Sequence, residues 1–391
     1  MQRTLKKIFP VLLLLMVAIP LQQCKQVYVN PHVSPQTGYL VVEGYISGNT
    51  ATSFTLSRTI KLSADTTNPQ EEGAGLQIEG DDNSIYPLTA TGGGVYSTTG
   101  VLPLNGSVKY RLHINTQTGE EYLSDYVPYK ITPSIDSINW KQDNSGVTIY
   151  ANAHDDAGGT RFYQWSYDAT WEYNSGEESE WEYDGNTNPV SVIPRTLASQ
   201  VFRCWTYQSS SNLLITNSTK LAKDEIYEYP INKIGAGDIR LSVLYSLLVR
   251  QYALTEDGYN FLSLMKKNTE SLGSIFDAQP SALKGNIHNV SDPTEQVIGF
   301  VSAGTVQQQR MFISRGQLSA WDYYFSCPVK DTFALNDPDA FLKFFAYGGY
   351  TPTFSHYSPG GALDYYFCNE KFCIDCTTRG GSNVKPAYWP N

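Results

Sequence analysis

The sequence predicts a mainly β fold with two immunoglobulin-like β-sandwich domains, the second larger than the first and carrying one inserted helix. Three observations support this prediction. The composition combines 28 Tyr, 16 Phe and 7 Trp with 31 Gly and 20 Pro, a mixture typical of antiparallel sheets and their turns. Short segments of alternating polar and apolar residues recur along the chain. One segment alone shows clear helical periodicity.

Chain length and net charge limit the number of domains and the kinds of partner that we expect. A chain of 391 residues is long enough for two or more domains, each with its own hydrophobic core. The formal net charge of −10 argues against a nucleic-acid partner, because binding to phosphates relies on Lys and Arg.

Residues 1–23 are predicted to be a signal peptide. Arg3, Lys6 and Lys7 form a positive start, and the apolar segment "IFPVLLLLMVAIPL" follows. That segment is interrupted by proline and is short for a membrane-spanning helix, which needs about 20 apolar residues. The pattern is typical of export.

The residues after the apolar segment predict a lipid anchor at Cys24. In "LQQC", Leu21 stands three residues before the cysteine, as it does in bacterial lipoproteins, although Gln22 and Gln23 replace the small residues usual there. The alternative is an ordinary signal peptide followed by an incidental cysteine. Two acyl chains on Cys24 would give stable membrane anchoring. Residues 24–37 would then be the lipidated cysteine and a polar, proline-containing tether.

Residues 38–130 are predicted to form the first sandwich. "GYLVVEGYIS" and "ATSFTLSRTI" alternate as paired strands do, and Asp81, Asp82 and Asn83 indicate a turn between two later strands. The number and spacing of the short strands are those of an immunoglobulin-sized module.

Residues 131–391 are predicted to form the larger sandwich. The boundary segment "ITPSIDSINWKQ" contains Pro133, and new strands such as "GTRFYQWSYDATWEYN" and "LSVLYSLLVRQYAL" follow. The inserted helix is expected near 255–272. Thr255 is its predicted N-cap, and its apolar face is formed by residues at helical spacing: Tyr259, Phe261, Leu262, Leu264 and Met265.

The segment "SGEESEWEYDGNTNP" is acidic and aromatic. We expect an exposed segment here, either a long loop or the tip of an extended hairpin. In the alternative interpretation the loop is a contact surface for a partner, with Trp181 and Tyr183 as its anchors, since aromatic residues dominate interface hot spots.

Five cysteines remain after Cys24, and export favours their oxidation. Structural zinc needs four ligands, and "CIDC" continues into a turn rather than into the helix of a redox motif. We therefore predict a disulfide within the last three cysteines and a long-range pair between Cys204 and Cys327, with one cysteine left over. Metal and redox sites are the alternatives. The five residues are Cys204, Cys327, Cys368, Cys373 and Cys376.

No catalytic residue, metal site or cofactor is predicted. The five histidines do not stand at metal-ligand spacings, and the chain lacks the G-x-S-x-G motif and the P-loop lysine. "HDDAGG", which begins at His154, is interpreted as a solvated turn rather than a calcium site. Arg379 is expected to fix a turn or pair with a carboxylate, and Trp389 to pack on the second domain.

Several long segments resemble, in order, a family of Bacteroidota lipoproteins known as domain of unknown function 4249. They include "GYLVVEGYIS", "GGGVYSTTG", "TPSIDSINW", "VLYSLLVRQYALTEDGYNFLSLMKKNTESLG" and "CIDCTTRGGSNVKPAYWP". The resemblance implies an outer-membrane lipoprotein, often encoded beside a TonB-dependent receptor. It implies no reaction and no catalytic residues.

The expected function is therefore that of a lipid-anchored outer-membrane protein, a non-enzymatic accessory or ligand-binding partner of a TonB-dependent transport system. Two alternatives stay open at this point: a secreted hydrolase whose site is assembled only in the fold, and a structural or adhesive surface protein. Cys24 is followed by Lys25 rather than by acidic residues, so the choice between the surface and the periplasmic face is left open.

Overall fold

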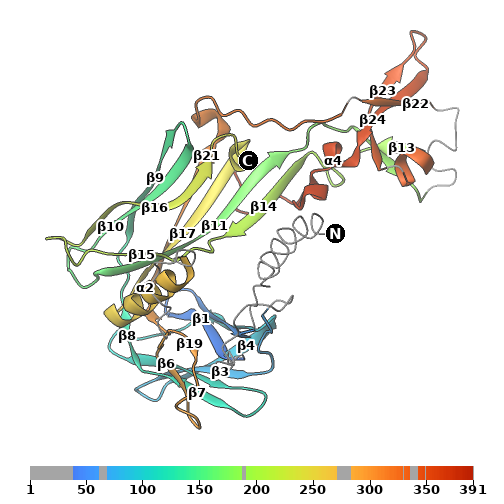
Figure 1. Cartoon of the computed structure of the whole chain (residues 1–391). Helices are drawn as coiled ribbons and strands as arrows, with labels where there is room; N and C mark the ends of the chain where they lie inside the picture. Colours follow the sequence, from blue (N-terminus) through green and yellow to red (C-terminus); the bar gives the residue numbers. More distant parts are fainter. Residues whose placement is uncertain are drawn as a thin grey trace, which may run out of the picture.

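The computed structural model describes residues 38–60, 68–186, 191–270, 283–328, 330–334, 342–347 and 349–390. The signal peptide, Cys24 and the tether lie outside these residues. Strands dominate the described chain, which confirms the prediction of a mainly β protein. Figure 1 shows three parts in a row: a barrel-like sheet around β1–β8, a two-layered part around β9–β17, and a smaller distal part that contains β22–β24.

The first part is a sheet that closes on itself. Around the ring the strands follow the order β6-β3-β4-β5-β2-β1-β20-β8, and β8 pairs again with β6. Leu56, Leu112 and Ile114 are among the fully buried residues of its core. The strands are β1 (Leu40–Ser47), β2 (Ala51–Arg58), β3 (Gly75–Gly80), β4 (Ile85–Gly92), β5 (Val95–Val101), β6 (Lys109–Asn115), β7 (Glu121–Ser124), β8 (Val127–Lys130), β18 (Ile287–Asn289), β19 (Ile298–Gly299) and β20 (Ala303–Gly304).

The ring is closed by two residues from much later in the chain. β20 lies parallel to β1 on one side and to β8 on the other, with Ala303 opposite both Ile46 and Tyr129. At Gly304 a Cβ atom would lie 2.1 Å from the Lys130 carbonyl oxygen, so only glycine fits. The prediction that 131–391 forms one separate sandwich is therefore wrong, because the chain returns to the first sheet.

The turn predicted at residues 81–83 is confirmed. Asn83 joins β3 to β4 with a φ of 69°, a left-handed conformation that Asn tolerates better than most residues. The Asp82 carboxylate accepts a hydrogen bond from the Ser84 N–H at 3.0 Å, which fixes the turn locally.

The second part has two layers. A sheet of order β16-β10-β9 faces a sheet of order β14-β11-β17-β21, with β15 paired to β11. Val147 and Ile149 of one sheet and Trp165, Tyr245 and Leu247 of the other share one core. One barrel-like sheet and one two-layered part thus replace the predicted pair of immunoglobulin-like sandwiches. The strands are β9 (Ile135–Asp143), β10 (Gly146–His154), β11 (Phe162–Asn174), β14 (Arg203–Ser209), β15 (Leu214–Asn217), β16 (Glu225–Gly235), β17 (Leu244–Ala253) and β21 (Val306–Ser314).

The predicted helix is present as α2 (Glu256–Glu270). It begins where predicted, because the Thr255 hydroxyl oxygen accepts a hydrogen bond from the Gly258 N–H at 3.1 Å. Glu256 and Asp257 lie in its first turn, where they favour the positive end of the helix dipole. Figure 1 shows α2 between the barrel-like sheet and the two-layered part.

The distal part has a small aromatic core made by Phe333, Phe345, Tyr366 and Cys368. It contains the sheet of order β22-β24-β23 and the hairpin β12-β13. Its elements are β12 (Trp181–Asp184), β13 (Ser191–Pro194), β22 (Asp331–Ala334), the π-helix η4 (Leu342–Ala346), β23 (Tyr350–Tyr357) and β24 (Leu363–Glu370); short helices elsewhere are η2 (Ile239–Leu241), η3 (Arg315–Gln317), α4 (Lys371–Ile374) and η5 (Cys376–Arg379).

Trp181 and Tyr183 belong to the β12–β13 hairpin, which is one of the two forms expected for this segment, but the expected exposure of the two side chains is wrong. Both residues lie on β12 and pack against the core of the distal part. The Trp181 ring meets Tyr366 edge-on at 5.2 Å between centroids, and Tyr183 stacks on Phe345 at 5.9 Å. The alternating aromatic side chains cover a small core, so neither Trp181 nor Tyr183 is available to bind a partner.

The disulfides are Cys204–Cys376 and Cys327–Cys373, and Cys368 is a buried free thiol. The predicted bond within the last three cysteines and the predicted Cys204–Cys327 pair are both wrong, although one of the three is left over as expected. Cys373 lies in α4 and Cys376 in η5, on either side of Asp375, whose backbone is extended. The two thiols therefore reach different neighbours.

The C-terminal tail, residues 371–390, begins with α4 against the distal strands β23 and β24, and from Cys376 onward it lies on the two-layered part, as predicted for Trp389. The Trp389 indole is 4% exposed, contacts the rings of Trp205 and Phe312, and donates a hydrogen bond to the buried Glu172 carboxylate at 2.8 Å. Arg379 donates to the Asn174 carbonyl at 2.7 Å and lies over the Tyr173 ring. It holds a backbone carbonyl rather than a carboxylate.

Candidate functional site

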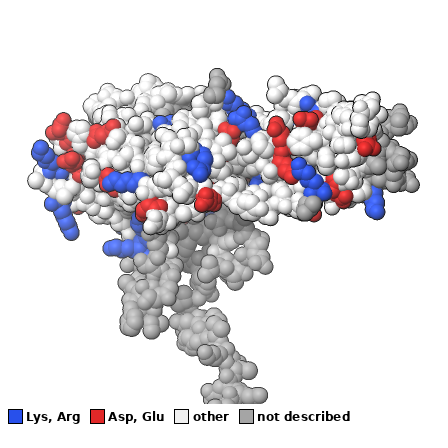
Figure 2. Space-filling model, turned by 90° about the horizontal axis from the view of Figure 1, so that it is seen from above, with Lys and Arg blue, Asp and Glu red and all other residues white. Residues whose placement is uncertain are grey.

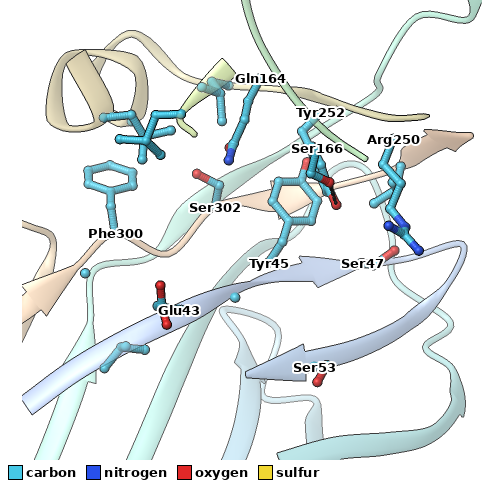
Figure 3. A pocket seen from close by; sticks show the side chains of 18 of the residues that line it. Glu43, Tyr45, Ser47, Ser53, Gln164, Ser166, Arg250, Tyr252, Phe300 and Ser302 are labelled. Carbon is cyan, nitrogen blue, oxygen red and sulfur yellow. Dashed lines mark hydrogen bonds between the residues drawn. The ribbon is translucent and has the colours of Figure 1, made fainter. Parts of the chain in front are cut away.

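A cavity of about 540 Å³ lies where the barrel-like sheet, the two-layered part and α2 meet. Five segments supply most of its lining: the β1–β2 hairpin, the outer faces of β11 and β17, the first turns of α2, and residues 299–308. This volume is within the range of small-molecule sites, which occur preferentially at the junctions of structural units. Figure 3 shows the lining side chains converging from these elements.

One wall is built by strand alternation. On β17, Val249 and Gln251 point into the core of the two-layered part and are fully buried, so Arg250 and Tyr252 point outward into the cavity. On β11, Ser166 lies opposite Arg250 in the register, and Gln164 lies opposite Tyr252. The hydroxyls of Ser166 and Tyr252 are 3.3 Å apart. The result is a wall of polar groups around one aromatic ring.

The facing wall comes from β1, where Glu43 and Tyr45 lie between the buried residues Val42 and Ile46. The Tyr45 ring meets the Tyr252 ring edge-on at 5.1 Å between centroids, which joins the two walls. Burial raises the pKa of Tyr45 well above its ordinary value, so its phenol is neutral at physiological pH.

The other end of the cavity is apolar. Phe261, Leu262 and Met265 of α2 face it, and the Phe300 ring lies 5.7 Å from that of Phe261. Figure 3 shows Phe300 beside the helix at this end and Arg250 near Ser47 at the opposite end. The cavity therefore has an apolar end, an aromatic middle and a polar end.

Two of the described lining residues carry a formal charge, Glu43 and Arg250. Arg250 donates a hydrogen bond to the Asp168 carboxylate at 2.6 Å, and the Ser209 hydroxyl donates to the same carboxylate at 2.7 Å. Burial raises the pKa of Asp168, but the bonds from Arg250 and Ser209 outweigh burial and leave this pKa below its ordinary value. The Arg250 charge is therefore compensated within the protein.

The described residues that the sequence predicted as site residues do not line this cavity. Cys24 lies outside the described residues, the disulfides join α4 and η5 to the segment before β22 and to β14, and Trp181 and Tyr183 pack against the distal core. Nor do the histidines converge. His113 lies between Glu79 and Glu121 at 2.7 and 2.9 Å.

His154, the first residue of the predicted turn, lies on another sheet, 2.8 Å from an Asp136 carboxylate oxygen. The hydrogen bond and the charge of Asp136 raise the pKa of His154. Within the described residues, three or more Asp, Glu, His or Cys side chains do not gather into a metal-binding group.

Sequence reasoning identified part of the cavity wall without recognising its role. Phe261, Leu262 and Met265 were expected to form the apolar face of the helix, but the pattern does not say which partner that face meets. The acidic Glu43 in the otherwise apolar "LVVEGYI" was the one local signal that a charged side chain interrupts a buried strand. Arg250 and Tyr252 look like ordinary outward-facing strand residues.

The described part of the chain contains no helix with the length and apolarity needed to span a membrane. Figure 2 shows the molecule from above, with acidic and basic side chains intermixed on that face. The electrostatic character of this view is thus mixed rather than of one sign.

Fold and cavity define a class: a mainly β protein with a closed barrel-like sheet, a two-layered neighbour and a pocket at their junction. A family model described as Domain of unknown function (DUF4249) matches residues 28–310, and the chain belongs to this family. All the cavity-lining residues fall within the match, whereas β22–β24 and the tail follow it. No curated protein matches the chain.

Proposed function

We propose that the protein is a lipid-anchored outer-membrane lipoprotein that binds a small organic ligand in the cavity at the junction. In this role it is a non-enzymatic accessory of a TonB-dependent transport system. The observation that carries the proposal is the cavity itself, with five converging segments and a volume of about 540 Å³.

The composition of the cavity supports binding. Ligand sites are mostly apolar and contain a few polar groups that orient the ligand. Here Phe261, Leu262 and Phe300 supply apolar surface, and Gln164 and Ser166 supply hydrogen-bonding groups. The location adds to this argument, because a bound molecule would contact both large parts of the protein at once.

The anchor is supported by the sequence. The positive start, the apolar segment and the "LQQC" that ends in Cys24 are typical of lipoprotein signals. A tether over residues 25–37 would span up to about 40 Å if extended, at roughly 3.3 Å per residue. The body could then reach the loops of a membrane partner while its lipid stays in the bilayer.

The distal part is the region that we propose meets a receptor. It lies at the end of the molecule away from the barrel-like sheet (Figure 1), and Tyr347 and Tyr357 are 84% and 51% exposed there. Tyrosine supplies large contact area with few rotatable bonds and is enriched at interface hot spots. These two residues replace Trp181 and Tyr183 as contact candidates.

The anchor is tested by Cys24→Ser. The variant should appear in the soluble fraction after cell disruption, whereas the wild-type chain should sediment with membranes. Retention of the variant in washed membranes of a strain that lacks the receptor would contradict the lipid anchor. Protease shaving of intact cells then distinguishes the surface from the periplasmic face.

Ligand binding and partnership are tested by mild detergent extraction and affinity purification. A TonB-dependent receptor should co-purify, and mass spectrometry of the denatured sample should detect a small molecule. In Leu262→Trp the new ring would fill the cavity and the small molecule should be lost. Asn260→Trp is the matched control, because Asn260 is exposed on the same helix and does not line the cavity.

Recovery of the chain with neither receptor nor small molecule would contradict the proposal. So would a small molecule that binds Leu262→Trp and wild type equally.

A further inference from the structure

Glu43 is the charged group of the cavity that none of the described residues neutralises. Its side chain is exposed to the cavity, and no hydrogen bond or ion pair joins its carboxylate to another described residue. The other charged lining residue, Arg250, is held by Asp168 at 2.6 Å. Among the residues that the structure describes, the lining therefore has one uncompensated negative charge.

The surrounding backbone opens space next to this carboxylate. β19 pairs with β1 at Val41 and Val42, and β20 pairs with β1 at Ile46 and Ser47. Between these two short ladders, residues 300–302 run outside the regular pairing and leave the β1 edge at Glu43 uncovered. Figure 3 shows Glu43 on the same side of the cavity as Phe300 and Ser302.

Aromatic rings flank the same space. Phe300 and Phe261 lie 5.7 Å apart, and Tyr45 and Tyr252 lie 5.1 Å apart, so two ring pairs border the cavity. The face of an aromatic ring attracts a cation, and the attraction grows when the cation is withdrawn from water. A carboxylate beside several rings is a suitable environment for an organic ammonium group.

We propose that the cavity selects molecules that carry a cationic amine attached to an apolar body. The amine pairs with Glu43, and the body packs on Phe261, Leu262, Met265 and Phe300. This inference rests on the proposed ligand-binding function and narrows it to one chemical class. An anionic ligand is disfavoured because Glu43 repels it and because Asp168 already satisfies Arg250.

The test uses three probes of nearly equal size and shape: 4-phenylbutylamine, 4-phenylbutanol and 4-phenylbutyrate. Isothermal titration calorimetry on the purified protein at pH 7 measures their dissociation constants. We expect the amine to bind about tenfold more tightly than the alcohol, since a charge-assisted hydrogen bond contributes roughly this much. The carboxylate should bind most weakly.

Glu43→Gln keeps the shape of the side chain and removes its charge. The variant should lose the roughly tenfold preference for the amine and keep the affinity for the alcohol. Glu225→Gln is the matched control, because Glu225 is an exposed residue of β16 outside the cavity. It should bind all three probes as the wild type does.

The other possible outcomes would contradict the proposed preference for a cationic ligand. Equal affinity for the three probes, or an amine preference that survives Glu43→Gln, would overturn the cationic selectivity while the cavity stays a binding site. Failure of the amine to bind at all would also overturn the selectivity. The co-purified small molecule described above judges the proposed function separately, because that experiment assumes no charge on the ligand.

Discussion

The body of the molecule and its distal part are stabilised in different ways. In the described residues of the barrel-like sheet, twenty buried side chains form one core, whereas the core of the distal part has four. Near the distal part, two disulfides hold the chain instead: Cys327–Cys373 joins α4 to the segment before β22, and Cys204–Cys376 joins η5 to β14, at sequence separations of 46 and 172. Because a small core supplies little hydrophobic free energy, disulfides contribute a larger share of the stability in this region.

The match to the family model also differs between the two regions. The match to DUF4249 covers the barrel-like sheet, the cavity and most of the two-layered part, and it ends at residue 310. The disulfide Cys327–Cys373 and strands β22–β24 lie beyond it. The shared region thus contains the cavity, and the region beyond the match contains most of the distal sheet.

The largest effect is expected from truncating a ring in each core. Phe54 and Phe333 are each 1% exposed. Phe54→Ala should lower the free energy of unfolding of the body by about 3–5 kcal/mol. Phe333→Ala should open the distal part and leave the body unchanged. Hydrogen exchange of peptides from β6 and β24 measures both; equal loss of protection in β6 by the two variants would show that the two regions unfold as one.

Removal of the longer disulfide should have the next largest effect. In Cys204→Ala/Cys376→Ala, the constraint on the unfolded chain is lost, at a typical cost of about 2–5 kcal/mol. Protease should then cleave the tail faster, while the barrel-like sheet stays resistant. Cys368→Ala is the control, because Cys368 is not cross-linked. Unchanged cleavage of the tail would show that packing of Trp389 is sufficient to hold it.

A smaller effect is expected at the tail itself. Trp389→Phe keeps a ring near Trp205 but removes the N–H that donates to Glu172. Glu172 keeps its bond from Arg203 at 2.7 Å, so we expect a local cost of about 1–3 kcal/mol.

Tyr388→Phe is the comparison for Trp389→Phe, since it loses a neutral hydrogen bond to Thr170 and should cost less. Exchange of amides in β11 and β14 measures both. A larger effect of Tyr388→Phe than of Trp389→Phe would contradict the expectation that the hydrogen bond from Trp389 to Glu172 contributes more stability than the bond between Tyr388 and Thr170.

The smallest effect concerns the free thiol. Burial raises the pKa of Cys368 from 9.0 to about 12, with a further contribution from Asp331. Because the folded state keeps the proton that the unfolded state releases, stability falls as pH rises from 9 towards 12. We expect a loss of about 1 kcal/mol at pH 10 in the distal part.

The loss at pH 10 should be absent in Cys368→Ala. Native protein should also resist alkylation by iodoacetamide at pH 8, and urea should make Cys368 react. Rapid alkylation of the native chain would show that the thiol is accessible.

Local signals in the sequence predicted local structure. Thr255 and the apolar residues after it predicted α2, and Asp82 with Asn83 predicted a turn, because capping and turn chemistry act within a few residues. Closure of the barrel-like sheet was not predictable, since β20 has two residues and no period. Pairing of cysteines was not predictable either, because sequence spacing does not determine which thiols meet.

The candidate site was largely hidden for a related reason. Its walls come from β1, β11, β17, α2 and the segment around Phe300, and each of these looks ordinary alone. Trp181 and Tyr183 failed as predicted contact residues because acidic neighbours suggested a loop, although the aromatics alternate as a strand does. Patterns specify which face of an element is apolar; assembly decides what that face meets.

Closure by β20 also has a consequence for the order of events during biogenesis. Until residues 303 and 304 emerge, β1 and β8 keep unpaired N–H and C=O groups along facing edges, and open edges invite pairing with other chains. The first sheet therefore cannot finish folding when its own strands have been made. A chain interrupted before residue 303 is expected to associate through these edges, so the newly made protein depends on protection from aggregation until the ring closes.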